Sequence, residues 1–276
     1  MKKLLTRSLT GICFVAVVVL TILYGDRPFL GGTSLLSNVF LIFTCVALYE
    51  YRSALRESGW ELGLFFLAVA VSIYVVMVFN PLISSGFSLF YVVLCLLMLL
   101  PVETLFRPQR SMESLAFSCY GIVWIVVPFA LLDYYPVWFP QGKFLLLAFF
   151  IAVWANDTFA YCVGSLMGKH PFFARISPKK TWEGTVGGAL LTVVAACFFP
   201  LLFPSLSLSR VEWIGFAVVV VLFGTLGDLV ESMFKRFTGV KDSGGLLPGH
   251  GGVLDRFDST LMALPFVTLY LKLIVQ

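Results

Sequence analysis

The sequence has little charge. Of its 276 residues, 12% are charged and 59% are hydrophobic, whereas soluble domains carry about 25% charged residues. A soluble core of this size would leave too little polar surface to face water. The shortage of charge excludes an ordinary soluble domain and favours the all-α class, as a polytopic helical membrane protein.

Metal-binding and nucleic-acid-binding patterns are also missing. The six cysteines are scattered through apolar segments, without a CxxC pair or a Cys/His cluster, which argues against a disulfide framework or a zinc site. No basic tract with interleaved aromatic residues is present, so we expect no nucleic-acid partner. No soluble domain, internal repeat or low-complexity linker is visible.

Long apolar runs fill most of the chain. Those that approach membrane length cover about 8–24, 34–50, 62–79, 87–102, 115–132, 144–163, 185–203, 211–227 and 260–275. They predict about nine transmembrane helices. We divide the chain into an N-terminal set of helices, 1–140, and a C-terminal region, 141–276, which carries two polar loops at 164–184 and 228–259.

The basic residues predict the orientation of these helices. With the N-terminus inside, 15 of the 19 Lys and Arg residues fall on the inner side. Short cytoplasmic loops retain Lys and Arg, so we expect a cytoplasmic N-terminus and an odd number of spans. Both polar loops then face the cytoplasm, where nucleotides and Mg²⁺ are available.

The stretch 227–259 concentrates charge beside apolar segments. Its five acidic residues are Asp228, Glu231, Asp242, Asp255 and Asp258. Two pairs of these are spaced three residues apart, which places each pair on one face of a helix. Four carboxylates at two helix ends are candidate ligands for Mg²⁺, which prefers oxygen. The alternative is solvated carboxylates that mark helix ends at the membrane interface.

Glycines and bases lie between these acids. Glycines allow backbone N–H groups to approach an anion closely, and bases neutralise phosphate charge. The bases are Lys235, Arg236, Lys241 and Arg256. The alternative is a basic loop attracted to anionic lipid, although such a loop does not need five acids. His250, in a glycine turn, is either a general base or a structural donor.

Asn156 and Asp157 lie in the cytoplasmic end of the sixth apolar run. An ionisable group at that depth is costly and usually faces a polar interior. The alternative is a residue that ends a helix at the membrane interface. Tyr161, one turn further on, is expected on the face of Asp157.

A polar segment, 177–184, precedes the seventh apolar run. Its Ser-Pro pair predicts a turn. Lys179 and Lys180 are candidates to hold nucleotide phosphates, and Ser177 or Thr181 to bind an oxygen. The alternative is anchoring by positive charge, with Trp182 in the aromatic belt of the membrane.

The polar residues of the C-terminal half resemble a known family. The spaced pattern is Ser232-x-x-Lys235-Arg236, then Lys241-Asp242, then Pro248-x-His250-Gly251-Gly252-x-x-Asp255-Arg256-x-Asp258. It resembles the signature of the phosphatidate cytidylyltransferase (CDP-diglyceride synthetase) family. Asn156-Asp157 and the segment 177–184 resemble further elements of that family. The resemblance covers roughly 150–276.

This resemblance implies that the cytidylyl group of CTP is transferred to phosphatidic acid, giving CDP-diacylglycerol and pyrophosphate in phospholipid biosynthesis. It implies Mg²⁺ as cofactor, with Asp228 and Asp255 as metal ligands. Glu231 and Asp258 are expected as supporting ligands, although their roles and that of His250 stay open. The residues expected to bind substrate are Asn156, Asp157, Ser177, Lys179, Lys180, Thr181 and Ser232.

The expected partners are CTP, phosphatidic acid and the lipid bilayer, and a homodimer stays an open alternative. The expected location is the inner membrane of the cell, as a multi-pass protein with its active site at the cytoplasmic face. Four bases and His250 complete the expected catalytic set: Lys235, Arg236, Lys241, His250 and Arg256.

Two other functions remain as alternatives. A secondary transporter with a polar cytoplasmic gate predicts inverted repeats and polar groups near the midplane in both halves. Here the polar residues cluster late in the chain, which favours an enzyme. A lipid-alcohol kinase that uses CTP would release CDP rather than pyrophosphate, so the product distinguishes it.

Overall fold

The structure, a computed structural model, describes the backbone of residues 2–28, 33–79, 85–106, 111–245 and 251–275. It is helical almost throughout, which confirms the all-α class. The elements are α1 (Lys2–Leu23), α2 (Leu35–Glu57), α3 (Leu64–Phe79), α4 (Ser85–Phe106), α5 (Ser111–Gly121), the π-helix η2 (Ile122–Val126), α6 (Val127–Trp138), α7 (Gly142–Met167), β1 (Pro171–Phe173), β2 (Ser177–Thr181), α8 (Trp182–Ala196), α9 (Phe199–Leu202), α10 (Arg210–Thr238) and α11 (Leu254–Ile274).

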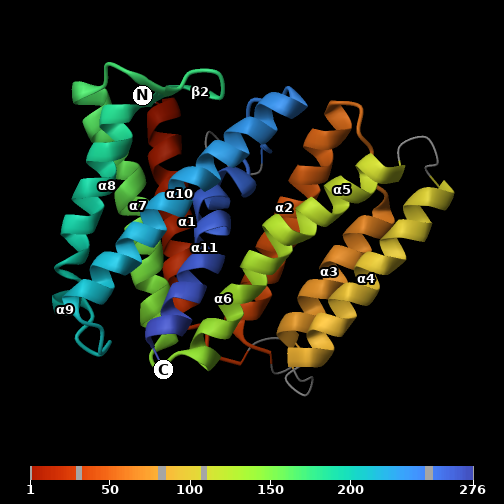
Figure 1. Ribbon diagram of the computed structural model, residues 1–276, viewed down its shortest axis with the longest axis horizontal. Coiled ribbons are helices and arrows are strands. Elements are labelled where there is room, and N and C mark those ends of the chain that lie inside the picture. The colour runs from red at the N-terminus through yellow and green to blue at the C-terminus, as the bar shows by residue number, and fades with distance from the viewer. Residues whose placement is uncertain (1, 29–32, 80–84, 107–110, 246–250, 276) are drawn as a thin grey trace. The chain divides into compact units, whose positions relative to one another are not determined.

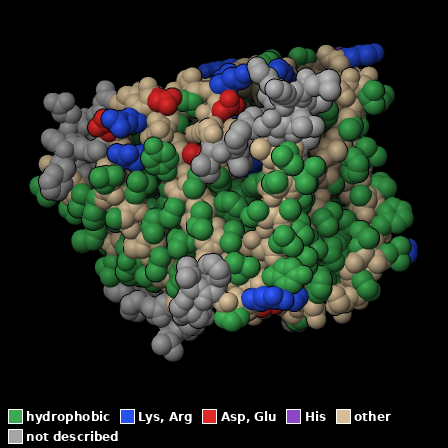
Figure 2. All heavy atoms as spheres, turned by 180° about the vertical axis from the view of Figure 1, so that it is seen from behind, with side chains coloured by type: hydrophobic (Ala, Val, Ile, Leu, Met, Phe, Trp, Pro, Cys, Tyr) green, Lys and Arg blue, Asp and Glu red, His purple; other side chains and the backbone are tan. Residues whose placement is uncertain are grey.

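Every apolar run of the sequence overlaps a helix, although the run 185–203 divides into α8 and the short α9 with a turn between them. Within the described residues, five helical stretches are long and apolar enough to cross a membrane: Leu35–Glu57, Met112–Trp138, Gly142–Met167, Arg210–Thr238 and Leu254–Ile274. Hydrophobic side chains cover most of the surface visible in Figure 2. The structure supports an all-α, multi-pass membrane protein, but the expected number of nine spans is not confirmed because several apolar helices are shorter.

The chain divides into two compact units, each built from two segments. Unit 1 consists of Met1–Tyr134 and Thr238–Arg256, and unit 2 of Tyr135–Phe237 and Phe257–Gln276. The sequence analysis instead divided the chain at a single point. The late segment Thr238–Arg256 belongs to unit 1 because its side chains and backbone contact α2, as described below.

Unit 1 is a bundle in which α3 packs against α2 and α4, and α5 packs against α4 (Figure 1). Helix α2 begins where Ser34 Oγ accepts a hydrogen bond from the Ser37 N–H at 3.0 Å, which satisfies one of the free N–H groups of a helix start. The Tyr51 hydroxyl donates to the Phe117 carbonyl at 2.8 Å. This bond ties the polar tip of a buried aromatic residue to the neighbouring helix.

Unit 2 places α7 and α8 side by side along their length (Figure 1). Small residues make this approach close. A Cβ on Gly188 would lie 2.8 Å from Ala160 Cα, and a Cβ on Gly184 would lie 2.9 Å from Gly164 Cα. Small residues at helix interfaces let backbones approach closely in a membrane. The two helices therefore hold the side chains that they carry at a short separation.

A short antiparallel hairpin joins α7 to α8 and was not predicted. Strand β1 pairs with β2, with Pro171 opposite Thr181 and Phe173 opposite Ser177. The prediction of a turn at Ser177-Pro178 was wrong, because these residues start the second strand. Proline lacks an N–H group, and a two-stranded hairpin leaves one side of each strand without a partner strand, so it tolerates proline there.

Helix α10 extends beyond the predicted apolar run. The run ends at Gly227, but the helix continues to Thr238. About the first third of the expected loop 228–259 is therefore helix rather than loop. Glu231 and Lys235 pair along this added part of the helix. The helix stops at Gly239, whose φ of +74° suits the position after a helix end.

Candidate functional site

A polar cavity of about 370 Å³ lies within unit 2, among α7, β2, α8 and α10. Most residues that line it carry hydroxyl, amide or charged groups. The polar lining residues are Asn156, Asp157, Tyr161, Ser165, Lys179, Lys180, Thr181, Thr185, Thr225 and Asp228. Six of these were predicted as site residues, so the fold brings together segments that are about 70 residues apart in the sequence.

An ion pair crosses this cavity. Lys180 of β2 pairs with the Asp228 carboxylate of α10. The Ser232 hydroxyl, one turn further along α10, donates to Asp228 Oδ1 at 3.3 Å. Both side chains of the ion pair are about one quarter exposed, so the pair is accessible from the cavity.

Three carboxylates of unit 2 act on one another electrostatically. Asp258, in the first part of α11, interacts with both Asp228 and Asp157. Helices α10 and α11 approach closely here, since a Cβ on Gly227 would lie 2.8 Å from Met262 Cβ and 3.1 Å from Ser259 Cα. Like charges close together repel one another, and a positive charge placed between them would lower that repulsion.

Asn156 adds an acceptor to the same region. Its side chain is 7% exposed, and its Oδ1 atom is buried without a hydrogen-bond partner. Buried polar atoms are nearly always bonded, and this residue lines the cavity. A ligand with a donor group would satisfy it.

The hairpin next to the cavity is fixed by two side chains of the start of α8. Thr181 Oγ accepts from the Gly184 N–H at 3.2 Å and so caps the helix. Glu183 accepts from the Lys169 and His170 N–H groups at 3.1 and 3.2 Å, and lies 2.5 Å from His170 Nδ1. The hydrogen bond from the His170 ring, helped by backbone N–H groups, lowers the pKa of Glu183 to about 2.

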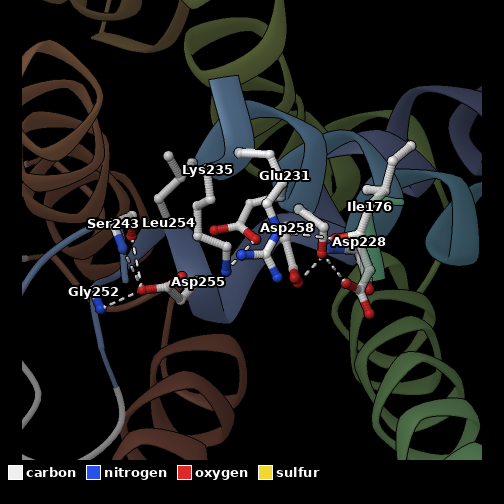
Figure 3. Close-up of polar contacts among 12 residues, drawn as sticks. Ile176, Asp228, Glu231, Lys235, Ser243, Gly252, Leu254, Asp255 and Asp258 are labelled. Carbon is white, nitrogen blue, oxygen red and sulfur yellow. Dashed lines mark hydrogen bonds and ion pairs between the residues drawn. The ribbon is translucent and has the colours of Figure 1, made fainter. Parts of the chain in front are cut away.

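The end of α10 carries two further predicted bases. Lys235 Nζ lies 2.5 Å from Glu231 Oε2, one turn earlier on the same helix (Figure 3). The Arg236 Nε–H donates to the Ile176 carbonyl at 3.1 Å, between the two strands of the hairpin. The structure thus gives Glu231 and Arg236 internal partners, and their predicted roles towards metal and phosphate stay predictions.

Asp255 binds the polar loop of unit 1, by which we mean the described residues between α10 and α11, 239–245 and 251–253. Its Oδ2 accepts from the Ser243 N–H at 2.9 Å, the Ser243 hydroxyl at 2.9 Å and the Gly252 N–H at 2.8 Å (Figure 3). One carboxylate oxygen is therefore committed to the loop itself. Its role as a metal ligand stays a prediction.

The donor set of unit 2 fits a hard cation only if the substrate contributes ligands. Among the described residues, no group of three His, Cys, Asp or Glu side chains is placed to hold a metal ion. Magnesium is usually bound through one or two carboxylates together with substrate phosphates, and Asp228 and Asp258 provide such carboxylates. The Lys180 ammonium already places a positive charge beside Asp228. A metal cation at Asp228 would supply a positive charge at the same place.

Other predicted site residues lie away from the cavity lining. Ser177 begins β2, and Ser232 contacts the cavity through Asp228. Lys241 and Arg256 are exposed residues of unit 1. His250 lies outside the described residues.

Sequence reasoning missed Glu50, a buried residue of α2 whose carboxylate contacts the start of α11 and the residue just before it. Its carboxylate accepts from the Val253 and Leu254 N–H groups. An acidic residue at the end of an apolar run was the one available signal, because such residues are costly in a membrane. Thr185 and Thr225 of the cavity lining were missed as well, since threonine is common in membrane helices.

Together, the fold and the site define a helical membrane protein with a polar cavity lined by both lysines and carboxylates. The sequence model of the cytidylyltransferase family matches residues 5–274. The chain therefore belongs to the cytidylyltransferase family, and the resemblance seen in the sequence is confirmed at that level.

Named relatives add detail. The phosphatidate cytidylyltransferase of Staphylococcus haemolyticus (strain JCSC1435) is 41% identical over 175 residues, which is 63% of this chain and 65% of the relative. That of Staphylococcus saprophyticus is 39% identical over 173 residues, again 63% and 65%. That of Staphylococcus aureus (strain COL) is 46% identical over 131 residues, 48% of this chain and 50% of the relative. The matched part thus spans at most about 65% of the length of these relatives.

Proposed function

We propose that the protein transfers the cytidylyl group of CTP to phosphatidic acid, giving CDP-diacylglycerol and pyrophosphate. The observation that carries this proposal is the cavity of unit 2, which is lined by Lys179, Lys180, Asp157 and Asp228 and in which Lys180 pairs with Asp228. Lysines suit phosphates, and carboxylates suit the cation that accompanies a nucleotide triphosphate. The family and the names of the relatives support the same reaction.

The reaction balances without a strong base. A phosphate oxygen of phosphatidic acid attacks the α-phosphorus of CTP and forms a new P–O–P linkage. The bond between the α-phosphorus and its bridging oxygen to the β-phosphate breaks, and pyrophosphate leaves. Because the attacking phosphate is already anionic, no proton has to be removed, and the rate depends on alignment and on neutralisation of charge.

In this proposal, the lysines of β2 bind the phosphates of CTP and Asn156 accepts a hydrogen bond from the nucleotide. Asp228 and Asp258 hold Mg²⁺, which when bound neutralises phosphate oxygens. The acyl chains stay in the bilayer beside the apolar helices. We place the site at the cytoplasmic face of the inner membrane, because 15 of the 19 basic residues fall on that side of the predicted topology.

Labelled CTP provides the test. The purified protein in detergent, with Mg²⁺ and phosphatidic acid, should move label from the α-phosphate of CTP into lipid, and label from the γ-phosphate into pyrophosphate. Asp228→Asn should lower this transfer at least about 100-fold, because the carboxylate next to Lys180 is lost. Asp26→Asn, an exposed residue outside the cavity lining, is the matched control.

Other outcomes select other functions. With a lipid alcohol supplied in place of phosphatidic acid, movement of the γ-label into lipid would identify a CTP-dependent lipid kinase. No movement of either label by folded protein, with several lipids, would leave the transporter as the alternative, although the matched family and the named relatives are cytidylyltransferases.

A further inference from the structure

The polar loop of unit 1 surrounds a buried carboxylate from a distant part of the chain. Glu50 lies in the last third of α2 and is 4% exposed. Its Oε1 accepts from the Val253 N–H at 3.0 Å, and its Oε2 from the Leu254 N–H at 2.9 Å. About 200 residues separate the partners in the sequence, so tertiary structure alone brings them together.

These N–H groups stand at the start of α11. The first N–H groups of a helix have no partner within the helix, and a carboxylate there is favoured by the helix dipole as well. The Glu50 carboxylate satisfies two of these groups, and the Ser243 hydroxyl also points to its Oε2 at 3.5 Å. Glu50 therefore fixes both where α11 begins and where the loop segment before it lies.

Glycines make room for this carboxylate. A Cβ on Gly244 would overlap the Glu50 carboxyl group, and a Cβ on Gly252 would overlap both Glu50 and the Ser243 hydroxyl. The sequence analysis expected these glycines to bring backbone N–H groups to an anion. The anion found beside them is a side chain of the protein itself.

We propose that Glu50 is a positioning residue for catalysis, which holds the described parts of the signature segment in unit 1, 241–245 and 251–256, in their working arrangement. This inference rests on the proposed function. Glu50 anchors the start of α11, and that start carries Asp255 and Arg256 of the signature. Asp258 follows Asp255 by one turn on the same helix. Loss of the anchor would therefore misplace several charged groups at once.

Two variants of α2 test the anchor in the full-length protein. Glu50→Gln keeps the size of the side chain but replaces one acceptor oxygen with a donor that faces an N–H group. Glu50→Asp keeps the charge with a shorter reach. Glu57→Gln is the matched control, because this exposed residue lies two turns further along α2.

The first readout is hydrogen exchange, which does not depend on activity. Glu50→Gln should speed exchange at the Val253 and Leu254 amides at least about tenfold, since each loses a charge-assisted hydrogen bond. The amides of α7, in unit 2, should keep their wild-type rates. Unchanged exchange at Val253 and Leu254 would overturn the anchor.

The second readout separates positioning from folding. With CTP and phosphatidic acid, Glu50→Gln should lower kcat at least about tenfold while KM for CTP changes less than about twofold, and Glu50→Asp should recover part of kcat. Faster exchange without a loss of kcat would overturn the role in catalysis. Wild-type protein that releases no pyrophosphate would instead refute the proposed function, and the exchange result would still decide the anchor.

A pair of adjacent glycines tests the same anchor without touching Glu50. Gly244→Ala should displace the Glu50 carboxylate and reproduce the loss of kcat and the faster exchange. Gly245→Ala should behave like wild type, because no atom of the described residues lies within 4 Å of the added Cβ. Equal effects of the two substitutions, or none from Gly244→Ala, would overturn the proposal even if the Glu50 variants fail to fold.

Discussion

At the scale of single residues, two lysines in or beside the proposed site already pair with carboxylates of the protein. Lys180 pairs with Asp228, and Lys235 lies 2.5 Å from Glu231. Each pair lies in or beside apolar helices, where an unpaired charge is expensive. Substrate phosphates or a cation that enter the site must therefore exchange partners with these residues rather than meet free charges.

Substitution of Lys180 tests whether this lysine binds the phosphates of CTP. Lys180→Gln removes the positive charge beside Asp228 and should lower kcat/KM for CTP about 10- to 100-fold, because phosphate charge is less well neutralised. Lys180→Arg should retain much of the activity. The measurement is the initial rate at varied CTP and saturating phosphatidic acid. Lys169→Gln, whose side chain is exposed and outside the cavity lining, is the control, and an equal loss in both would contradict the assignment.

Glu183 gives a prediction about pH. Its pKa is lowered from 4.5 to about 2 in the folded protein, so its contribution to stability is present above pH 4.5 and is lost as pH falls towards 2. Glu183→Gln should therefore lower Tm at neutral pH, and the difference from wild type should shrink as the pH is lowered to about 3. Glu61→Gln, an exposed residue 3.9 Å from Arg56, should show a small difference. A gap that grows on acidification would refute the assignment.

At the scale of elements, close helix packing places the carboxylates of α10 and α11 near each other. The backbone of α10 at Gly227 approaches α11 so closely that a side chain does not fit there. One turn earlier, Gly224 has more room, since its nearest side-chain neighbour would be Ser259 Cβ at 3.7 Å. The contact at Gly227 thus sets the separation of the two helices where Asp228 and Asp258 lie.

Two alanine substitutions test this packing. Gly227→Ala should destabilise the protein by about 1–3 kcal/mol, as overpacking does, and should also lower activity because it pushes α10 from α11. Gly224→Ala should be tolerated. The measurements are Tm in detergent and transfer of the α-label from CTP. If both variants behave alike, the close approach at Gly227 is not what positions the carboxylates.

At the scale of the whole molecule, the predicted orientation places both polar segments in the cytoplasm. Helix α7 provides the test, because its 26 residues span about 39 Å at 1.5 Å per residue, more than the roughly 30 Å of the bilayer core. Lys143 lies at its start, and Arg175 follows its end. These two residues are therefore expected on opposite sides of the membrane.

Single cysteines in a variant that lacks the six native ones can report this orientation. Arg175→Cys should react with a membrane-impermeant thiol reagent in inside-out vesicles and be protected in right-side-out vesicles. Lys143→Cys should show the opposite pattern. The reversed result for both would invert the topology and place the proposed site away from cytoplasmic CTP.

Much of the fold could be read from the sequence, because membrane helices must satisfy their backbone internally and so appear as long apolar runs. The polar patterns of the sequence and the family resemblance likewise pointed to Asp157, Lys179, Lys180 and Asp228, which line one cavity. The end of α10 was misjudged because apolar length marks the membrane, whereas a helix continues until its hydrogen bonds stop, here before Gly239.

The sequence by itself determined the class of protein and the kinds of charged group available for its chemistry, since both depend on composition and on residues close together in the chain. Tertiary structure alone decided which charges are partners. It paired Lys180 with Asp228, and it brought Glu50 to the N–H groups of Val253 and Leu254. Spacing along one helix predicts its neighbours, but contacts between distant segments depend on how the helices pack.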